Sequence, residues 1–310
     1  MIIAVSMLNP EAQDWWCKEL SRLMPEDTIV PRDGIENPES VDYALVWRPA
    51  TGWIASLPNL RAVISCAAGV DHIFADSALP ADMPVIRTIG DDLTQRMKEY
   101  VLLHVLRHHR RMPDICAAQR NREWNQIVTP VASERTVAIL GLGNLGATAA
   151  GAVSAIGFRT LGWSRSLKRI GGVECHAGEE GLRAVIGAAD IVVNLLPLTD
   201  ETRGLIDAAF LAAMKPGASF INAGRGGHVV EADLLAALDA GQLSHATLDV
   251  FETEPLPDDS PFWSHPSVTV TPHIASMIDP MTGARIVARN IREHRDTGRS
   301  PFEVSAERGY

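Results

Sequence analysis

Arg225, Glu254 and His273 combine a cation, an acid and a group that can exchange a proton near neutral pH. Each of them comes shortly after one of three apolar, strand-like runs, at residues 218–222, 246–250 and 267–271. Ligands of an open α/β sheet bind at the carboxyl ends of its strands, so we expect the three side chains at one edge of a sheet. A single such residue is usually structural or solvated, whereas three at one edge favour chemistry.

This set of groups suits the interconversion of a 2-oxo acid and a 2-hydroxy acid. His273 can supply the proton to the oxygen, because the ordinary pKa of a histidine is about 6.5. A neighbouring Glu254 would favour the imidazolium and orient the ring. Arg225 can grip the carboxylate and carbonyl oxygens as a fork, and a nicotinamide would carry the hydride.

Two series of short apolar runs must position these residues. They alternate with helical stretches, which is typical of parallel α/β sheets. The first series lies at 2–6, 43–47, 61–66 and 85–89, and the second at 136–141, 159–163, 190–196 and the three runs above. A helical segment at 94–119 separates them, and Pro113 can kink or split it. We therefore expect a dinucleotide-binding Rossmann-type domain at 98–274, and a smaller substrate-binding domain formed by 1–97 with 275–310.

A glycine-rich turn opens the second series. Residues 136–146 read TVAILGLGNLG, so Gly141, Gly143 and Gly146 have the spacing GxGxxG directly after a strand and before a helix-like run. In a dinucleotide site these glycines permit the tight turn, the approach of the pyrophosphate and close packing of helix on strand. The pyrophosphate then lies on the amides at the helix N-terminus. In this context the turn predicts a dinucleotide site.

The next turn is basic. No Asp or Glu occurs between Gly146 and Glu174, where an acid would bind the ribose 2′-OH of NAD. The turn instead offers a set of hydroxyl and cationic side chains, namely Ser164, Arg165, Ser166, Lys168 and Arg169. Such groups suit the 2′-phosphate of NADP. We therefore expect NADPH as the preferred cofactor, with NADH possible; the alternative is a solvated basic loop.

Composition excludes several classes of protein. The chain has 310 residues, 46% of them hydrophobic, and a formal net charge of −10, which argues against nucleic acid and anionic membranes as partners. Its four cysteines form no CxxC pair, and the N-terminus lacks a basic leader, so we expect a cytoplasmic location.

A group of histidines lies in the helical segment. His104 and His108 have the i, i+4 spacing of metal ligands, and His109 follows them. No acid or cysteine accompanies them locally, so we expect no metal and a helix that faces solvent or a second copy of the chain.

The motifs as a set resemble the D-isomer-specific 2-hydroxyacid dehydrogenase family, over the whole chain. Within it, the chain is similar to a branch that reduces glyoxylate and hydroxypyruvate. The resemblance rests on AAGVDHI (67–73), the glycine turn, NLLPLTDETRGLI (194–206), NAGRGGHVVEADLLAAL (222–238), LDVFETEPLP (248–257), TPHIAS (271–276) and ERGY (307–310); the branch rests on ALVWRP (44–49), the WSRS turn and SPFWSHPSVTVTPH (260–273).

The resemblance implies a flavodoxin-like substrate domain beside the Rossmann-type domain, the cofactor in the cleft, and a homodimer built around the nucleotide domain. It assigns catalysis to Arg225, Glu254 and His273, and a D product where the product is chiral. It implies further cofactor contacts from Asn144, Leu145, Leu196, Pro197, Thr202, Ala223, Gly224 and Asp249. It places the substrate against the backbone of Ala68 and Gly69 and the side chains of Trp47 and Arg48, although Trp47 is equally plausible as ordinary core.

Two alternatives to an NADPH-dependent reductase of glyoxylate or hydroxypyruvate stay open. The same fold can act with NAD on another 2-hydroxy or 2-oxo acid, or on phosphite. A nicotinamide-sensing binding protein of the corepressor type is the other alternative, although no long extra tails are visible.

Overall fold

The computed structural model describes residues 1–304, apart from the side chain of Asp91, so the ERGY motif at 307–310 lies outside the described residues. The chain divides into two compact units, Met1–Asp92 with Ile278–Tyr310 and Leu93–Met277. The boundaries differ from the expected 97/98 and 274/275. The first falls earlier because the long helix that begins at Asp91 belongs almost wholly to the second unit.

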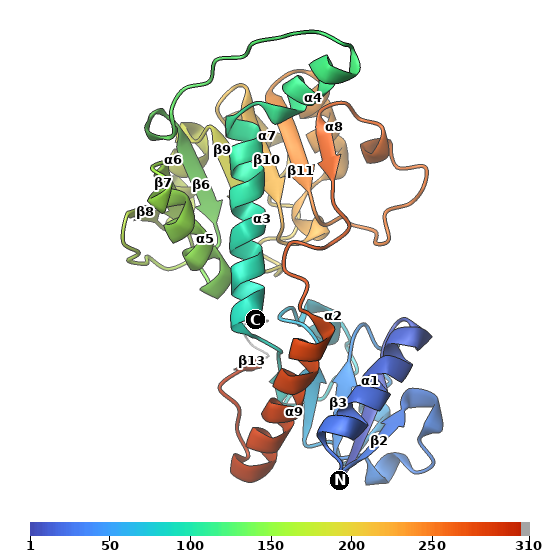
Figure 1. Cartoon of the computed structure of the whole chain (residues 1–310). Helices are drawn as coiled ribbons and strands as arrows, with labels where there is room; N and C mark the ends of the chain where they lie inside the picture. Colours follow the sequence, from blue (N-terminus) through green and yellow to red (C-terminus); the bar gives the residue numbers. More distant parts are fainter. Residues whose placement is uncertain (305–310) are drawn as a thin grey trace. The chain divides into compact units, whose positions relative to one another are not determined.

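Unit 1 is built on a six-stranded sheet (Figure 1). Its order is β13-β5-β4-β3-β1-β2, and only β13 runs antiparallel to its neighbour. Without β13 this is the flavodoxin order 2-1-3-4-5. The strands are β1 (Ile2–Ser6), β2 (Thr28–Pro31), β3 (Tyr43–Val46), β4 (Ala62–Ser65), β5 (Val85–Ile86) and β13 (Glu303–Val304), and the helices are α1 (Pro10–Leu23), α2 (Asp71–Phe74) and α9 (Pro280–Thr297).

Unit 2 is built on a seven-stranded parallel sheet of order β12-β11-β10-β9-β6-β7-β8. Its strands are β6 (Thr136–Leu140), β7 (Arg159–Trp163), β8 (Val173–His176), β9 (Ile191–Asn194), β10 (Ala218–Asn222), β11 (Leu243–Leu248) and β12 (Val268–Val270). Its helices are α3 (Asp91–His109), α4 (Met112–Arg120), α5 (Asn144–Ala155), α6 (Gly178–Ala188), α7 (Ala208–Ala213) and α8 (Glu231–Asp239). If the strands are numbered within this unit and the sheet is read from β8, the order begins 3-2-1-4-5-6, as in the Rossmann fold. The expected two-domain α/β fold is confirmed.

Apolar runs predicted the central strands because both faces of each sheet are covered by helices and loops. Every residue of β3, β4, β6, β9 and β10 is buried, and a parallel strand buried on both faces is a continuous apolar run. In unit 2, α3 and α5 contribute to the core on one face, whereas α6, α7 and α8 contribute to the core on the other. The edge strands β2 and β8 are half exposed, and their mixed sequences TIVP and VECH gave no such signal.

Local signals define the helix ends. Asp279 caps α9 by accepting a hydrogen bond from the backbone N–H of Thr282, and Gly298 ends the same helix in the left-handed conformation. The predicted segment 94–119 is split into α3 and α4. Arg111 is left-handed at the break, and Pro113 lies in the first turn of α4, where its missing N–H costs nothing.

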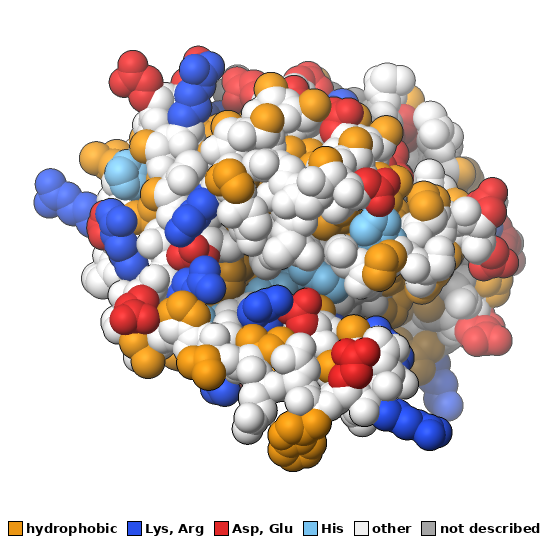
Figure 2. Space-filling model, turned by 90° about the horizontal axis from the view of Figure 1, so that it is seen from above, with side chains coloured by type: hydrophobic (Ala, Val, Ile, Leu, Met, Phe, Trp, Pro, Cys, Tyr) orange, Lys and Arg blue, Asp and Glu red, His pale blue; other side chains and the backbone are white. Residues whose placement is uncertain are grey.

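Charges of both signs are mixed on the surface. On the face that Figure 2 shows, Lys and Arg lie among Asp, Glu and apolar side chains, so neither sign forms a continuous field there. Within residues 1–304, none of the helices combines the length and the apolar character that a membrane crossing requires.

Candidate active site

The three candidate catalytic residues all lie in unit 2, beyond the ends of three neighbouring strands. Arg225 follows β10, Glu254 follows β11 and His273 follows β12. His273 and Glu254 are in direct contact, with 2.9 Å between Nδ1 and Oε2. Arg225 is anchored in part on its own chain, since its Nη1 donates to the carbonyl of Gly224 at 2.8 Å.

The contact with Glu254 determines which ring nitrogen of His273 is engaged within the chain. A carboxylate only accepts hydrogen bonds, so Nδ1 carries a proton, and Nε2 takes no part in this contact. The other carboxylate oxygen, Oε1, accepts from the backbone N–H of Phe251 at 3.1 Å. The His273 side chain is 34% exposed and that of Glu254 16%. The pair is therefore accessible yet held in one orientation.

The loop that carries His273 is built around a buried carboxylate. Asp249, which is 1% exposed, accepts from the backbone N–H groups of Ile274 and Ala275, each at 2.9 Å, and from Thr271 Oγ1 at 2.6 Å. His273 itself has a φ of +55°, a conformation that a non-glycine residue adopts only when its surroundings compensate the cost. Asp249 was expected to contact the cofactor; both of its carboxylate oxygens are engaged within the chain.

Tyr100 on α3 completes this support. Its hydroxyl lies 2.7 Å from Thr271 Oγ1. Because Thr271 gives its proton to Asp249, the phenol must be the donor. Burial, and after it the charge of Asp249, raises the pKa of Tyr100 and keeps the phenol protonated. Sequence analysis assigned no role to Tyr100 or Thr271: Tyr100 belongs to none of the motifs quoted there, and Thr271 stands in TPHIAS (271–276) without a separate signal of its own.

Gly226 brings the Arg225 loop against the loop that carries Glu254. A Cβ at this position would lie 1.8 Å from the carbonyl carbon of Phe251 and 2.3 Å from the nitrogen of Glu252. Both are backbone atoms, so neither can move aside cheaply. Only glycine allows the two loops to meet at this distance.

The glycine turn has the geometry that the spacing predicts. Gly141 has a φ of +95°, and a Cβ at Gly146 would lie 1.8 Å from the carbonyl oxygen of Gly141. Nothing lies within 4 Å of the place where a Cβ of Gly143 would be. The helix α5 begins at Asn144 without a side-chain cap, so its first amides, including that of Leu145, face this open space.

The basic turn follows β7. Arg165, Ser166, Lys168 and Arg169 are exposed. Ser164 is buried, and its hydroxyl donates to the carbonyl of Ser166 at 2.8 Å, so it shapes the turn. A fourth basic residue, Arg159, is held by Glu174 through two hydrogen bonds of 2.9 Å.

The remaining candidate cofactor residues follow β9 and β10. Thr202 donates to the carbonyl of Pro197 at 2.8 Å and closes the loop that contains Leu196. Ala223 and Gly224 are the first residues after β10. All of these positions lie at the carboxyl edge of the same sheet as the glycine turn.

The candidate substrate residues of unit 1 lie at the carboxyl ends of β3 and β4. Trp47 packs against His72 with the ring centroids 4.6 Å apart, and the Arg48 guanidinium lies 5.8 Å from the Trp47 ring. Arg48 has a φ of +49°. Ala68 and Gly69 follow β4. The strained backbone of Arg48 is the kind of feature that accumulates at ligand sites.

The histidines of α3 are buried, so the expectation that they face solvent or a second copy is wrong. They lie on the side of the helix that packs on the sheet of unit 2. His108 Nε2 lies 2.9 Å from Thr247 Oγ1 on β11, and His104 packs against Tyr100. The i, i+4 spacing indicated one shared face but not which way it points. Nowhere in the described part of the chain do three or more potential metal ligands gather.

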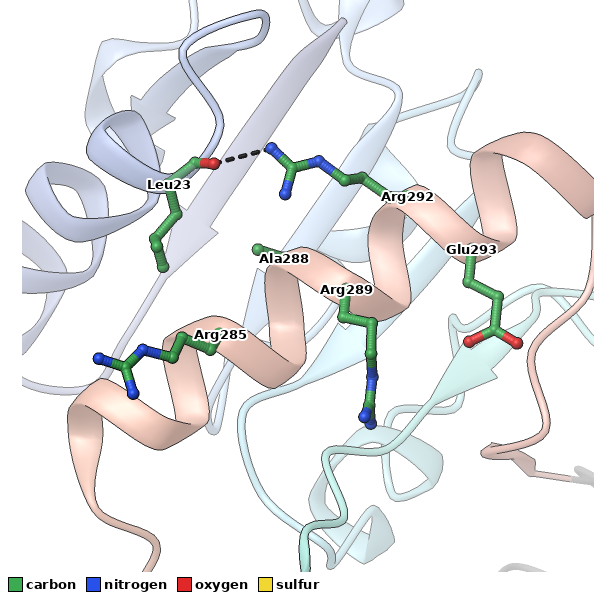
Figure 3. Close-up of a pocket in the computed structure, with 6 residues that line it drawn as sticks. All are labelled: Leu23, Arg285, Ala288, Arg289, Arg292 and Glu293. Carbon is green, nitrogen blue, oxygen red and sulfur yellow. Dashed lines mark hydrogen bonds between the residues drawn. The ribbon is translucent and has the colours of Figure 1, made fainter.

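A surface groove of unit 1 is rich in arginine, but its cations do not converge. It is lined by Leu23, Arg285, Ala288, Arg289, Arg292 and Glu293. Figure 3 shows Arg292 directed to the carbonyl of Leu23, 2.7 Å away, whereas Arg285 and Arg289 point in other directions. The groove therefore has no common point for an anion.

Comparison with known proteins agrees with this arrangement. The family model "D-isomer specific 2-hydroxyacid dehydrogenase, NAD binding domain" matches residues 102–275, more than half of the chain. A glyoxylate/hydroxypyruvate reductase A of Serratia proteamaculans is 42% identical over 89% of this chain and 90% of its own.

Solved structures extend the similarity to both units. A D-isomer specific 2-hydroxyacid dehydrogenase of Xanthobacter autotrophicus Py2, in complex with NADPH and MES, has a TM-score of 0.91 and 43% identity, covering 99% of each chain. An NADPH-dependent glyoxylate/hydroxypyruvate reductase of Sinorhizobium meliloti, in complex with NADP and sulfate, has a TM-score of 0.90 and 36% identity over 100% of this chain and 99% of its own. The chain therefore belongs to the D-isomer specific 2-hydroxyacid dehydrogenase family and is an NAD(P)-dependent enzyme.

Proposed function

We propose that this enzyme reduces small 2-oxo acids, glyoxylate and hydroxypyruvate above all, with NADPH, and that it forms the D isomer where the product is chiral. The observation that carries the proposal is the contact between His273 Nδ1 and Glu254 Oε2, which leaves Nε2 for a substrate oxygen. The names of the relatives from Serratia and Sinorhizobium support the choice of substrate.

The roles of the residues follow from their chemistry. When bound, the reduced nicotinamide supplies the hydride that forms the new C–H bond. Arg225 pairs with the substrate carboxylate and orients the carbonyl group. His273 gives its Nε2 proton to the carbonyl oxygen, and Glu254 stabilises the imidazolium before that transfer. From unit 1, the proposal assigns substrate contacts to Trp47, Arg48 and the backbone of Ala68 and Gly69.

The residues of unit 2 fit a dinucleotide. The open space beside Gly143 accommodates a pyrophosphate on the amides of α5. The proposal assigns further cofactor contacts to Leu196, Pro197, Thr202, Ala223 and Gly224, and to Asp249 through its backbone, because the Asp249 carboxylate is engaged within the chain. The exposed Arg165 and Lys168 suit the 2′-phosphate of NADP, with Ser166 and the buried Ser164 as further ligands from the turn.

A steady-state panel tests the substrate and the class of protein together. We expect the highest kcat/KM with NADPH and glyoxylate or hydroxypyruvate, and lower values with pyruvate, larger 2-oxo acids and, in the oxidative direction, phosphite with NAD. Tight binding of NADPH without turnover of any member of the panel would instead indicate a nicotinamide-sensing protein.

One substitution tests the cofactor. Arg165→Asp should lower the ratio of kcat/KM for NADPH to that for NADH on the order of 100-fold, because hydrogen bonds to a charged group are lost and repulsion replaces them. Arg159→Gln is the matched control. Arg159 begins β7, the strand that leads into the turn, and is paired with Glu174. The ratio of kcat/KM for NADPH to that for NADH should therefore not change in this variant. An unchanged ratio in Arg165→Asp would indicate that the basic turn is a solvated loop that does not select the cofactor.

We also propose that the enzyme is a homodimer joined through unit 2. Leu103 and Leu106 point outward from α3, and the segment 121–135 exposes Trp124 by 92% and Val128 by 96%. Clustered apolar exposure of this kind marks interfaces. Light scattering should give twice the chain mass of 33.6 kDa, and the double variant Trp124→Ser, Val128→Ser should shift it toward one chain.

The four cysteines are free thiols, as suits a reducing compartment. The cytoplasm remains the proposed location. Fractionation of the native host, with the activity followed, tests it.

A further inference from the structure

Three fully buried polar side chains lie behind the backbone of Arg225. Asn194 ends β9, Asn222 ends β10, and His228 lies in the turn after Arg225; each has 0% of its surface exposed. A buried polar group destabilises a protein unless it is hydrogen-bonded, so every one of these groups should have a partner. The bonds that they make have only one consistent set of directions.

The two asparagines orient each other. Asn222 Oδ1 accepts from the backbone N–H of Gly224 at 3.2 Å, and Asn194 Nδ2 therefore donates to the same oxygen at 2.9 Å. Asn222 Nδ2 is then left to donate to the carbonyl of Arg225 at 3.1 Å. One side of the Arg225 backbone is thus held by an amide whose orientation is already determined.

His228 holds the other side. Its Nδ1 lies 3.2 Å from the backbone nitrogen of Arg225 and 3.0 Å from Asn194 Nδ2. Both of these groups are donors, so Nδ1 must be the acceptor and carries no proton. Nε2 lies 3.1 Å from the carbonyl oxygen of Pro197, which only accepts, so Nε2 carries the proton. The contacts therefore select the neutral Nε2–H tautomer.

We infer that His228 is a positioning residue that holds Arg225 in a fixed position relative to the loop after β9. One ring nitrogen binds the peptide that presents the guanidinium, and the other binds Pro197, which belongs to the loop proposed to face the cofactor. His228 thereby sets the cation for the substrate carboxylate relative to the bound nicotinamide. The inference rests on the proposed role of Arg225 in binding the 2-oxo acid.

Close packing makes the arrangement specific for this ring. A Cβ on Gly224 would lie 3.2 Å from His228 Cε1 and 3.0 Å from Asn194 Nδ2. A displaced side chain therefore has little space to adopt another position. The two ring nitrogens can therefore be tested one at a time.

Two isosteric variants separate the two bonds. In His228→Asn, Oδ1 takes the place of Nδ1 and keeps the acceptor for Arg225 N–H, but nothing reaches Pro197. In His228→Gln, Nε2 reaches Pro197, but the acceptor for Arg225 is lost. For His228→Gln we expect the KM for glyoxylate to rise about tenfold, the loss of one hydrogen bond, while the dissociation constant for NADPH stays unchanged. For His228→Asn, which keeps the bond to Arg225 but loses the bond to Pro197, we expect a smaller rise in the KM for glyoxylate, about threefold, again with an unchanged dissociation constant for NADPH.

A purely structural histidine gives a different pattern. Both variants would then lose thermal stability to a similar degree and keep the KM of wild type, and this result would overturn the inference while leaving the proposed function intact. Absence of wild-type turnover with every 2-oxo acid would instead overturn the proposed function.

The tautomer is measured without a variant, which covers the case in which His228→Gln does not fold. Ring ¹⁵N spectra of histidine-labelled wild-type protein, assigned through bonds, should show His228 with a protonated Nε2 and a bare Nδ1 at pH 8, where the ordinary histidine pKa of about 6.5 leaves the ring neutral. A proton on Nδ1 would be incompatible with the Arg225 bond and would overturn the inference.

Discussion

The loops that carry Arg225 and His273 leave the same sheet two strands apart, yet they are held by different chemistry. The Arg225 backbone is bonded by neutral groups, the amide of Asn222 and the imidazole of His228. The His273 loop is bonded by two carboxylates, those of Asp249 and Glu254. A residue that must attract an anion is best fixed by groups without charge, since an acid there would weaken its field. A proton donor profits from the opposite arrangement, because a neighbouring anion favours its charged form.

Removal of the proton donor should have the largest effect. His273→Gln keeps a polar side chain of similar length but cannot act as an acid, so kcat should fall about 1,000-fold, within the usual range for general acid–base catalysis. The dissociation constant of NADPH should not change, which a fluorescence titration checks. Turnover within tenfold of wild type would remove His273 from the role of acid.

Acid should destabilise unit 2 through two buried histidines, His104 on α3 and His245 on β11. Burial, and after it the charge of Arg107, lowers the pKa of His104 and of His245 to about 4. The unfolded chain therefore binds more protons than the folded chain between about pH 6.5 and 4, and the free energy of unfolding falls as the pH is lowered through this window. The slope should be about 1 kcal/mol per pH unit for each histidine.

His245→Gln tests this slope. The amide can keep the contact with Thr269 but does not titrate, so urea titrations from pH 7 to 4 should lose the contribution of one proton. An unchanged slope would mean that other groups dominate the acid response.

An exchange of charge between the two loops sharpens the comparison. Asp249→Asn puts an NH₂ group against groups that donate to the carboxylate, and should lower the free energy of unfolding by about 2 kcal/mol and reduce kcat. Asn222→Asp puts a carboxylate against the carbonyl of Arg225, and should mainly raise the KM for the 2-oxo acid. The comparison fails if both variants change the same kinetic constant.

The smallest effect is expected from the outer support of the His273 loop. Tyr100→Phe removes one donor to Thr271 and should cost about 1 kcal/mol of stability, with kcat within about threefold of wild type. Tyr43→Phe is the matched control, because it removes a buried tyrosine bond to His294 in unit 1. It should cost similar stability and leave kcat unchanged; a large loss of kcat in Tyr43→Phe would contradict this.

Much of the fold could be predicted from the sequence because its central strands are continuous apolar runs and its first βα turn requires glycine at fixed positions. The carboxyl ends of β10, β11 and β12 followed from the same runs, and with them the shared edge for Arg225, Glu254 and His273. The anchoring residues could not be predicted. Asn194, Asn222 and His228 lie in stretches that carry the family resemblance, but nothing in the sequence links them to one another, and only their common burial reveals a network.

The histidines of α3 show a second limit of prediction from the sequence. With no acid or cysteine beside them in the sequence, His104 and His108 were expected on a face toward solvent or a second copy, whereas in the structure His108 contacts Thr247 on β11 and His104 packs against Tyr100. Burial of a polar side chain depends on the partner that meets it, and that partner lies about 140 residues away in the chain.

Contact between two backbones at Gly226 limits how this enzyme can acquire new substrates. Any side chain there would push apart the turn that presents the guanidinium and the segment that leads to Glu254, so even a change to alanine would disturb both. Substitution at this contact in unit 2 is therefore not a route to new substrates. On the proposed assignment of the substrate residues, preference for a bulkier or more polar acid is expected to arise through changes at Trp47 and Arg48 in unit 1.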